Sequence, residues 1–359
     1  MEQQQLTVRQ LRALGAVWLL APALRLYPAT AAELAGRAAW LSPLLALPAA
    51  LGYGWMLHRL LARRLPGEDT VSLLRRALGE RASRAVLLLI GLFFLFYAGF
   101  SLRSGAQRFI TTIFPQAKPV PFALSMGVLA ALAAAGPLRT LGRCGKVILP
   151  VLLLTLGFIL LAALPTVRLE NLLPLRPRDA LPALAGALPG LDVLAAVLFL
   201  SLFLSAPGEG QRFAPTAVWI ALLGLLLSLL GLTLVGNFGA ELTASLQRPF
   251  FYLVRNLVFF RNVERVEALV VALWVFPDFL LVSCSLTAGV RCLAPALDRP
   301  EKRLSILCAL AAAVLACFLG RSAASYAALS ERVVPLAGMS LALLLLPGCF
   351  LLGKWRRRI

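Results

Sequence analysis

Apolar runs of about 20 residues recur along this chain, and each is long enough for a helix to cross about 30 Å of hydrocarbon. The polar linkers between them are short, apart from segments near residues 59–84, 104–120, 166–180 and 237–266. The runs centre near Val17, Ala49, Phe93, Ala130, Leu154, Val197, Leu225, Leu280, Val314 and Leu343. The pattern predicts an all-α integral membrane protein with about ten transmembrane helices.

Composition supports this class independently of the runs. Hydrophobic residues make up 60% of the 359 residues, charged residues only 14%, and the mean hydropathy is +0.86. These values exclude a soluble domain of this length. Because no linker is long enough for a separate soluble domain, we predict that residues 1–359 form a single polytopic membrane domain.

Lys and Arg residues are distributed unevenly between the two sides of the predicted bundle. Cationic loops stay in the cytoplasm, and with the N-terminus inside, the inside loops hold roughly 21 of the 35 cations. An even number of spans then places both termini in the cytoplasm. The basic tail Lys354-Trp355-Arg356-Arg357-Arg358 is expected to contact anionic membrane lipid.

The net charge of +19 would suit nucleic acid, but the cations are scattered over the membrane edges. No basic patch with interleaved aromatic residues appears, so no nucleic-acid partner is predicted. The six cysteines lack C-x-x-C spacing, and His58 is the only histidine. Metalloprotease, Walker and nucleophile-elbow motifs are also missing. We therefore expect no enzymatic activity, no cofactor and no metal site.

Interrupted helices are the strongest pointer to a binding site in a chain of this kind. A secondary transporter unwinds one helix in each inverted repeat and exposes backbone groups at the bilayer midplane. Ten spans divide into five plus five, and the first span contains Gly15 and Pro22, while the sixth contains Pro189-Gly190. These positions correspond in the two halves. The alternative is a pair of kinked helices without a ligand, because Pro and Gly are common in membrane helices.

Two carboxylates fall within predicted spans, where an ionisable group costs about 2.5–3.5 kcal/mol on insertion scales. Asp192 follows Pro189-Gly190 in the sixth span, and Asp278 lies in the eighth. Each is a candidate to bind a substrate ammonium or a proton, and Tyr97 in the third span is a candidate to close the site. The alternative for either carboxylate is pairing with a buried arginine such as Arg103 or Arg25.

Several short segments resemble those of the spore germination permease family, the transporter-like B subunits of nutrient germinant receptors within the amino acid–polyamine–organocation superfamily. Each lies at the edge of a predicted span. They are Ala35-Gly36-Arg37-Ala38-Ala39-Trp40-Leu41, Leu141-Gly142-Arg143-Cys144 followed by Pro150, Asn171-Leu172-Leu173-Pro174, Arg248-Pro249-Phe250-Phe251-Tyr252-Leu253-Val254-Arg255, and Glu264-Arg265-Val266-Glu267 leading to Trp274. Two departures stand out. Ala38 replaces a commonly acidic residue, and Leu20-Ala21-Pro22-Ala23 replaces a glycine-rich stretch.

The resemblance implies a LeuT-like fold with a first repeat at about residues 8–166 and a second at about 180–354. It also implies a small-nutrient pocket among spans one, three, six and eight, with Pro22, Tyr97, Pro189, Gly190, Asp192 and Asp278 as candidate binding residues. Assembly with an A-type membrane subunit and a lipoprotein C-type subunit in the spore inner membrane would follow.

Two functions fit the sequence. In the first, the chain is a receptor subunit that binds a germinant, such as an amino acid, and transmits the resulting shift between two conformations to its partner subunits. In the second, it is an ion- or proton-coupled amino-acid permease that works alone. The lack of an obvious proton-relay chain and the family resemblance both favour the receptor.

Overall fold

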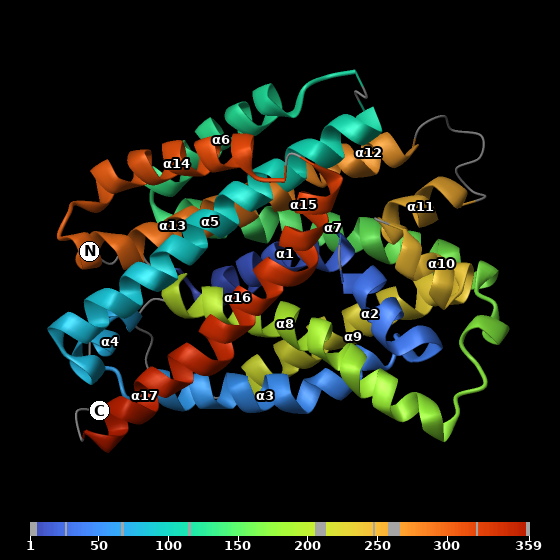
Figure 1. Ribbon diagram of the computed structural model, residues 1–359, viewed down its shortest axis with the longest axis horizontal. Helices are drawn as coiled ribbons and strands as arrows, with labels where there is room; N and C mark the ends of the chain where they lie inside the picture. Colours follow the sequence, from blue (N-terminus) through green and yellow to red (C-terminus); the bar gives the residue numbers. More distant parts are fainter. Residues whose placement is uncertain are drawn as a thin grey trace.

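Helices make up the secondary structure of the chain (Figure 1). The computed structural model describes residues 6–25, 27–65, 68–113, 116–204, 213–246, 248–257, 266–320 and 322–356, and it has no strand in these ranges. Glu264 and Arg265 of the family-like segment lie outside the described residues, as do Arg357 and Arg358 of the basic tail. The all-α prediction is confirmed for the part of the chain that is described.

The long segments follow the order of the apolar runs. They are α1 (Val8–Arg25) with α2 (Tyr27–Ala35), α3 (Ser42–Leu61), α5 (Glu80–Ile113), α6 (Pro119–Ala135), α7 (Leu138–Ala163), α8 (Ala180–Leu204), α9 (Ala214–Phe238), α12 (Val266–Leu273) with α13 (Val275–Leu297), α14 (Glu301–Phe318), and finally α15 (Ala323–Ala328), α16 (Val334–Met339) and α17 (Leu346–Trp355). The last three are joined by the π-helical turns Leu329–Val333 and Ser340–Leu345.

Shorter elements connect these segments. They are the helices α4 (Thr70–Leu78), α10 (Ala240–Ser245) and α11 (Pro249–Asn256) and the 3₁₀ turns Gly36–Ala38, Leu164–Thr166, Leu169–Asn171 and Pro177–Asp179.

Each predicted run centre lies in one of the long segments. Within the described ranges, seven helical segments are long and apolar enough to cross a membrane, and α6 is a shorter apolar helix of 17 residues. The 18-residue helices α1 and α14 carry several charges near their ends, and α14 begins with Glu301, Lys302 and Arg303. The segments therefore agree with the prediction of about ten spans.

The short helices occupy corresponding places in the two halves of the chain. Helix α4 joins the second span to the third, and α10 and α11 join the seventh span to the eighth. Figure 1 places α4 and the end of α17 at one end of the bundle, and α10 and α11 at the opposite end. Equivalent connections thus lie at opposite ends of the bundle, as expected for two repeats of inverted orientation. On this basis we propose repeats at about residues 8–166 and 180–354.

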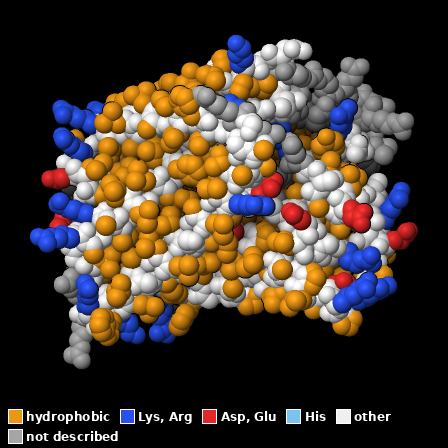
Figure 2. All heavy atoms as spheres, viewed as in Figure 1, with side chains coloured by type: hydrophobic (Ala, Val, Ile, Leu, Met, Phe, Trp, Pro, Cys, Tyr) orange, Lys and Arg blue, Asp and Glu red, His pale blue; other side chains and the backbone are white. Residues whose placement is uncertain are grey.

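The side of the bundle is covered by hydrophobic side chains, and most Lys and Arg residues in that view lie toward its two ends (Figure 2). Large apolar residues on the outer helices are exposed, among them Leu132, Leu154 and Leu344. Such a surface is stable only in contact with lipid. Glu331 and Arg332 are exceptions, because both are exposed within the last span.

Hydrogen bonds attach α4 to the end of α8. The Thr70 hydroxyl donates to the Leu202 carbonyl at 2.5 Å, and the Arg64 guanidinium donates to Thr70. Burial lowers the pKa of Arg64 to about 10, while the carboxylates of Asp69 and Glu68 oppose the shift. Because Arg64 stays charged at neutral pH, this loop is held in place by an ionised donor.

Helices α5 and α13 cross at two glycines. A Cβ added to Gly91 would lie 2.5 Å from Cγ of Leu293, and one added to Gly289 would lie 3.4 Å from the Gly91 carbonyl oxygen. Small residues allow membrane helices to approach closely, since dispersion contacts rather than the hydrophobic effect drive their association in lipid. The crossing therefore depends on the missing side chain at Gly91.

Gly91→Val is expected to lower the free energy of unfolding by about 1–3 kcal/mol through overpacking. Thermal unfolding of the purified protein in detergent measures the loss. Gly157→Val on α7 is the matched control, because no atom lies within 4 Å of a Cβ at that position. Equal melting temperatures for the two variants would contradict the close crossing.

The charge distribution and the positions of α4 and α11 together predict a topology. Arg81 is exposed at the start of α5, directly after α4, and Asn256 is exposed at the end of α11. Figure 1 places α4 and α11 at opposite ends of the bundle. We expect a membrane-impermeant maleimide to label Asn256→Cys from outside the cell and to label Arg81→Cys only after permeabilisation. The unmodified chain, with its own six cysteines, gives the background. Labelling of both variants from the same side would refute the orientation.

Candidate functional site

Aromatic side chains from α1 and α5 meet at the centre of the bundle. The rings of Trp18 and Tyr97 are 5.5 Å apart, and the ring of Phe93 stacks on Tyr97 at 6.0 Å. The Trp18 indole N–H donates to the Ser285 hydroxyl of α13 at 3.4 Å. Tyr97 is therefore buried where the first, third and eighth spans converge.

Asp192 lies beside this aromatic cluster, near the middle of α8. A Cβ added to Gly338 of α16 would lie 3.7 Å from Oδ1 of Asp192 and 3.5 Å from Cζ of Phe93. The carboxylate is half-buried and forms no hydrogen bond or ion pair with any residue that the structure describes. An unpaired carboxylate at this depth requires a proton, a cation or water.

The segment of the tenth span that faces Asp192 has an irregular backbone. Helix α16, which carries Gly338, lies between two π-helical turns. Such turns are frequent at functional sites in membrane and soluble helices. The sequence analysis placed the pocket among spans one, three, six and eight and did not include this contribution from the tenth span.

The predicted interruptions at Pro22 and Pro189-Gly190 are wrong for the described helices. Helix α1 continues through Pro22 to Arg25, and α8 continues through Pro189 and Gly190. A proline removes one helical N–H, but all other backbone groups must remain bonded within the helix when no water is present. In the first span, the described helix α1 runs to Arg25, three residues beyond Pro22.

Gly190 faces neighbouring helices rather than an open cavity. A Cβ at this position would lie 3.4 Å from Cα of Pro43 on α3, 3.6 Å from Cβ of Ala46, and 3.7 Å from Cε2 of Tyr27 on α2. A larger side chain would therefore push α3 away from α8. The Tyr27 hydroxyl is buried without a hydrogen-bond partner among the described residues, and the sequence analysis missed this residue.

Asp278 is separate from the Asp192 cluster, because it forms a buried ion pair with Arg108 of α5. A Cβ on Gly105 would lie 2.9 Å from Oδ2 of Asp278, so the glycine gives the carboxylate room to reach α5. The ring of Phe251 on α11 covers the Arg108 guanidinium at 5.9 Å. Asp278 is therefore paired with a buried arginine, which was the alternative to a binding role. The partner is Arg108 instead of Arg103 or Arg25.

Arg103, one of the two candidate partners named from the sequence, has a different partner. Arg103 donates to the carbonyl of Gly320 at 3.3 Å, and the side chain of Arg25 lies outside the described residues. Arg108 and Gly105 follow one another on α5 at a spacing of three residues, which places them on one helix face. The spacing of Gly105 and Arg108 was the only feature of the sequence that pointed to the Arg108–Asp278 ion pair. It does not indicate which carboxylate faces Arg108.

The spore germination protein family matches residues 5–324 of the chain. The chain belongs to this family. "Putative spore germination protein YfkT" from Bacillus subtilis (strain 168) is 25% identical over 267 residues, which is 73% of this chain and 72% of that relative. The resemblance of the short segments is thus confirmed at the level of the family.

Solved transporters share the fold. Mhp1, a nucleobase-cation-symport-1 family transporter in a closed conformation with bromovinylhydantoin bound, has a TM-score of 0.64 at 15% identity, covering 92% of this chain and 77% of its own. A Na⁺-coupled sialic acid symporter in a substrate-bound outward-open state has a TM-score of 0.61 at 14% identity, covering 95% and 78%. The LeuT-like, all-α membrane fold is therefore confirmed.

Breaking the Arg108–Asp278 pair is expected to destabilise the protein rather than to alter ligand binding alone. Asp278→Asn leaves a buried guanidinium without its counter-charge, a change that costs about 3–5 kcal/mol. The double variant Arg108→Met with Asp278→Leu should recover much of the loss, because neither charge remains. Thermal unfolding of the three proteins provides the comparison, and a double variant no more stable than Asp278→Asn would contradict the structural role.

Proposed function

We propose that the chain is the transporter-like subunit of a nutrient germinant receptor, and that it binds a small germinant, an amino acid, at the Asp192 cluster. Membership of the spore germination family and the fold of small-molecule symporters support this proposal. The observation that carries it is the unpaired Asp192 carboxylate near Phe93, whose ring stacks on Tyr97.

The ammonium of an amino acid suits this position. It would neutralise Asp192 in a site where the low dielectric strengthens the attraction, and aromatic faces add cation–π stabilisation. Pro22 has no N–H, so the carbonyl of Trp18, four residues earlier, lacks its usual helical donor. That carbonyl, on the residue whose ring contacts Tyr97, is a second acceptor, and it gives Pro22 a role without a break in α1.

The carboxylate of the amino acid, at the opposite end from its ammonium, needs hydrogen-bond donors from the protein. Tyr27 of α2 is a candidate donor through its side-chain hydroxyl. Tyr27 lies against Gly190, two residues before Asp192 on α8, and its hydroxyl is unpartnered among the described residues. Pro189 and Gly190 then act indirectly, by allowing α2 and α3 to approach α8.

Signalling follows from a difference in affinity between two conformations. A germinant that binds one packing of the first and sixth spans more tightly than the other shifts the population toward it. In the proposed receptor, A-type and C-type subunits in the spore inner membrane respond to that shift. The chain needs no catalytic group for this role, in keeping with a non-enzyme.

A stand-alone ion- or proton-coupled amino-acid permease is the second candidate. The observation that favours it is the same unpaired Asp192, because an isolated carboxylate near the midplane also suits a coupling proton or cation. Under this alternative the same cluster binds the substrate, and movement of the spans carries it across the membrane.

Asp192→Asn keeps the shape of the side chain and removes its charge. We expect it to raise the concentration of zwitterionic germinant needed for a half-maximal response by about tenfold or more, since a hydrogen bond to a charged group contributes about 1.5–3 kcal/mol. Spore germination dose–response curves with confirmed subunit abundance measure this effect. Asp298→Asn is the matched control, because Asp298 is exposed in a left-handed conformation that Asn adopts readily. Unchanged curves for Asp192→Asn would place the ligand elsewhere.

Deletion of the gene distinguishes the two candidates. Loss of the response to one set of nutrients, with germination by calcium–dipicolinate intact and co-purification with two further subunits, would support the receptor. Normal germination together with lost amino-acid uptake in growing cells would instead support the permease.

A further inference from the structure

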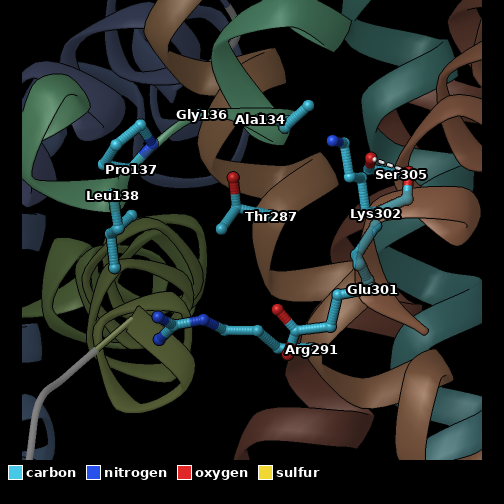
Figure 3. Close-up of a pocket in the computed structure, with 11 residues that line it drawn as sticks. Ala134, Gly136, Pro137, Leu138, Thr287, Arg291, Glu301, Lys302 and Ser305 are labelled. Atoms are coloured by element: carbon cyan, nitrogen blue, oxygen red, sulfur yellow. Dashed lines mark hydrogen bonds between the residues drawn. The ribbon is translucent and has the colours of Figure 1, made fainter. Parts of the chain in front are cut away.

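A polar pocket of about 330 Å³ lies at the α4 end of the bundle, where α6 meets α7 and α13 meets α14 (Figure 3). Its position at this end follows from the neighbouring Pro295, whose carbonyl accepts a hydrogen bond from Arg75 of α4 at 3.0 Å. The volume is at the lower end of the range of about 300–1,000 Å³ that is typical of ligand sites. The pocket is distinct from the Asp192 cluster, which lies near the middle of the bundle.

Positive charge dominates the lining. Figure 3 shows Lys302 and Arg291 on either side of Thr287, with the Glu301 carboxylate beside Arg291. Arg291 donates to the Phe203 carbonyl at 3.1 Å, a bond that fixes its guanidinium and leaves further N–H groups for a ligand. Two cations and one carboxylate leave the pocket with a net positive charge.

Two long helices also begin in this pocket. Helix α7 begins at Leu138 after Pro137, and α14 begins at Glu301 after Pro300. In neither case does an N-cap side chain accept a hydrogen bond from the first turn. The Thr140 N–H of α7 donates to the Pro137 carbonyl at 2.9 Å. The remaining N–H groups of the two first turns and the positive ends of two helix dipoles add to the field of Arg291 and Lys302.

The pocket opens beside the lipid-facing surface. Leu129 and Leu132 on α6 and Ile306 and Leu310 on α14 are all exposed, and α6 packs against α14. Because α6 ends and α14 begins here, the pocket lies where the apolar surface gives way to charged residues. A group bound in it would lie at headgroup depth, and an attached acyl chain would run along α6 and α14.

From this arrangement we propose that the pocket formed by Arg291, Lys302 and the starts of α7 and α14 binds a phosphate group. Phosphate matches the donors, because guanidinium, ammonium and first-turn amide groups all hydrogen-bond its oxygens. The adjoining apolar surface makes an anionic phospholipid headgroup one source of the phosphate, and a free phosphate is the other. A bound phosphate would link the turn between α6 and α7 to the turn between α13 and α14 through its hydrogen bonds.

The test uses the full chain, purified in detergent and depleted of lipid. Its thermal unfolding is followed with phosphatidylglycerol, phosphatidylcholine or inorganic phosphate added. We expect phosphatidylglycerol or inorganic phosphate to raise the melting temperature by about 3 °C or more, with phosphatidylcholine giving a smaller rise. A rise with phosphatidylglycerol alone identifies the lipid as the source, and an equal rise with inorganic phosphate identifies the free anion.

Lys302→Gln should remove at least half of the rise, and Arg291→Gln should do the same. Lys302 is exposed, so its variant leaves the fold intact, whereas Arg291 also bonds to α8. Arg303→Gln is the matched control, because Arg303 is the exposed neighbour of Lys302 and does not line the pocket. Equal rises with phosphatidylglycerol and phosphatidylcholine and none with inorganic phosphate, or a full rise retained in Lys302→Gln, would overturn the proposal.

Discussion

The close crossing of α5 and α13 positions most of the features described above. Gly91 and Gly289 allow the two backbones to approach, and in lipid such contacts replace the hydrophobic effect as the source of helix association. Tyr97 lies on α5 and Ser285 on α13, and Trp18 of α1 contacts both. A shift of one helix against the other would therefore disturb the central cluster as well as the packing.

Two carboxylates within the membrane have opposite environments. Asp278 is neutralised by Arg108, the ring of Phe251 on α11 lies over the guanidinium, and the pair joins α5 to α13. Asp192 has no such partner among the described residues. Since a charge in a low-dielectric region is costly unless it is compensated, the first is best understood as structure and the second as a place for a ligand charge.

Polar groups gather in two regions of the bundle, the central Asp192 cluster and the pocket around Lys302, and the two regions suit ligands of opposite charge. The central cluster offers a carboxylate, a carbonyl and hydroxyls, which suit an ammonium group. The pocket around Lys302 offers an excess of positive charge at the membrane edge, which suits a phosphate. Helix α13 contributes Ser285 to the central cluster and Arg291 to the pocket around Lys302. A ligand in either region would therefore affect the position of the same helix.

The sequence by itself determined the membrane class, the positions of the spans and the family, because hydrophobic runs and segment motifs are local properties of the chain. It also indicated Asp192 and Tyr97 as polar groups within apolar spans. Only the tertiary structure decided that Arg108 is the residue paired with Asp278, that Gly190 packs against α3, and that α1 and α8 continue through their prolines. Those outcomes depend on which helix faces meet across long sequence separations, and on backbone hydrogen bonds that remain intact without water.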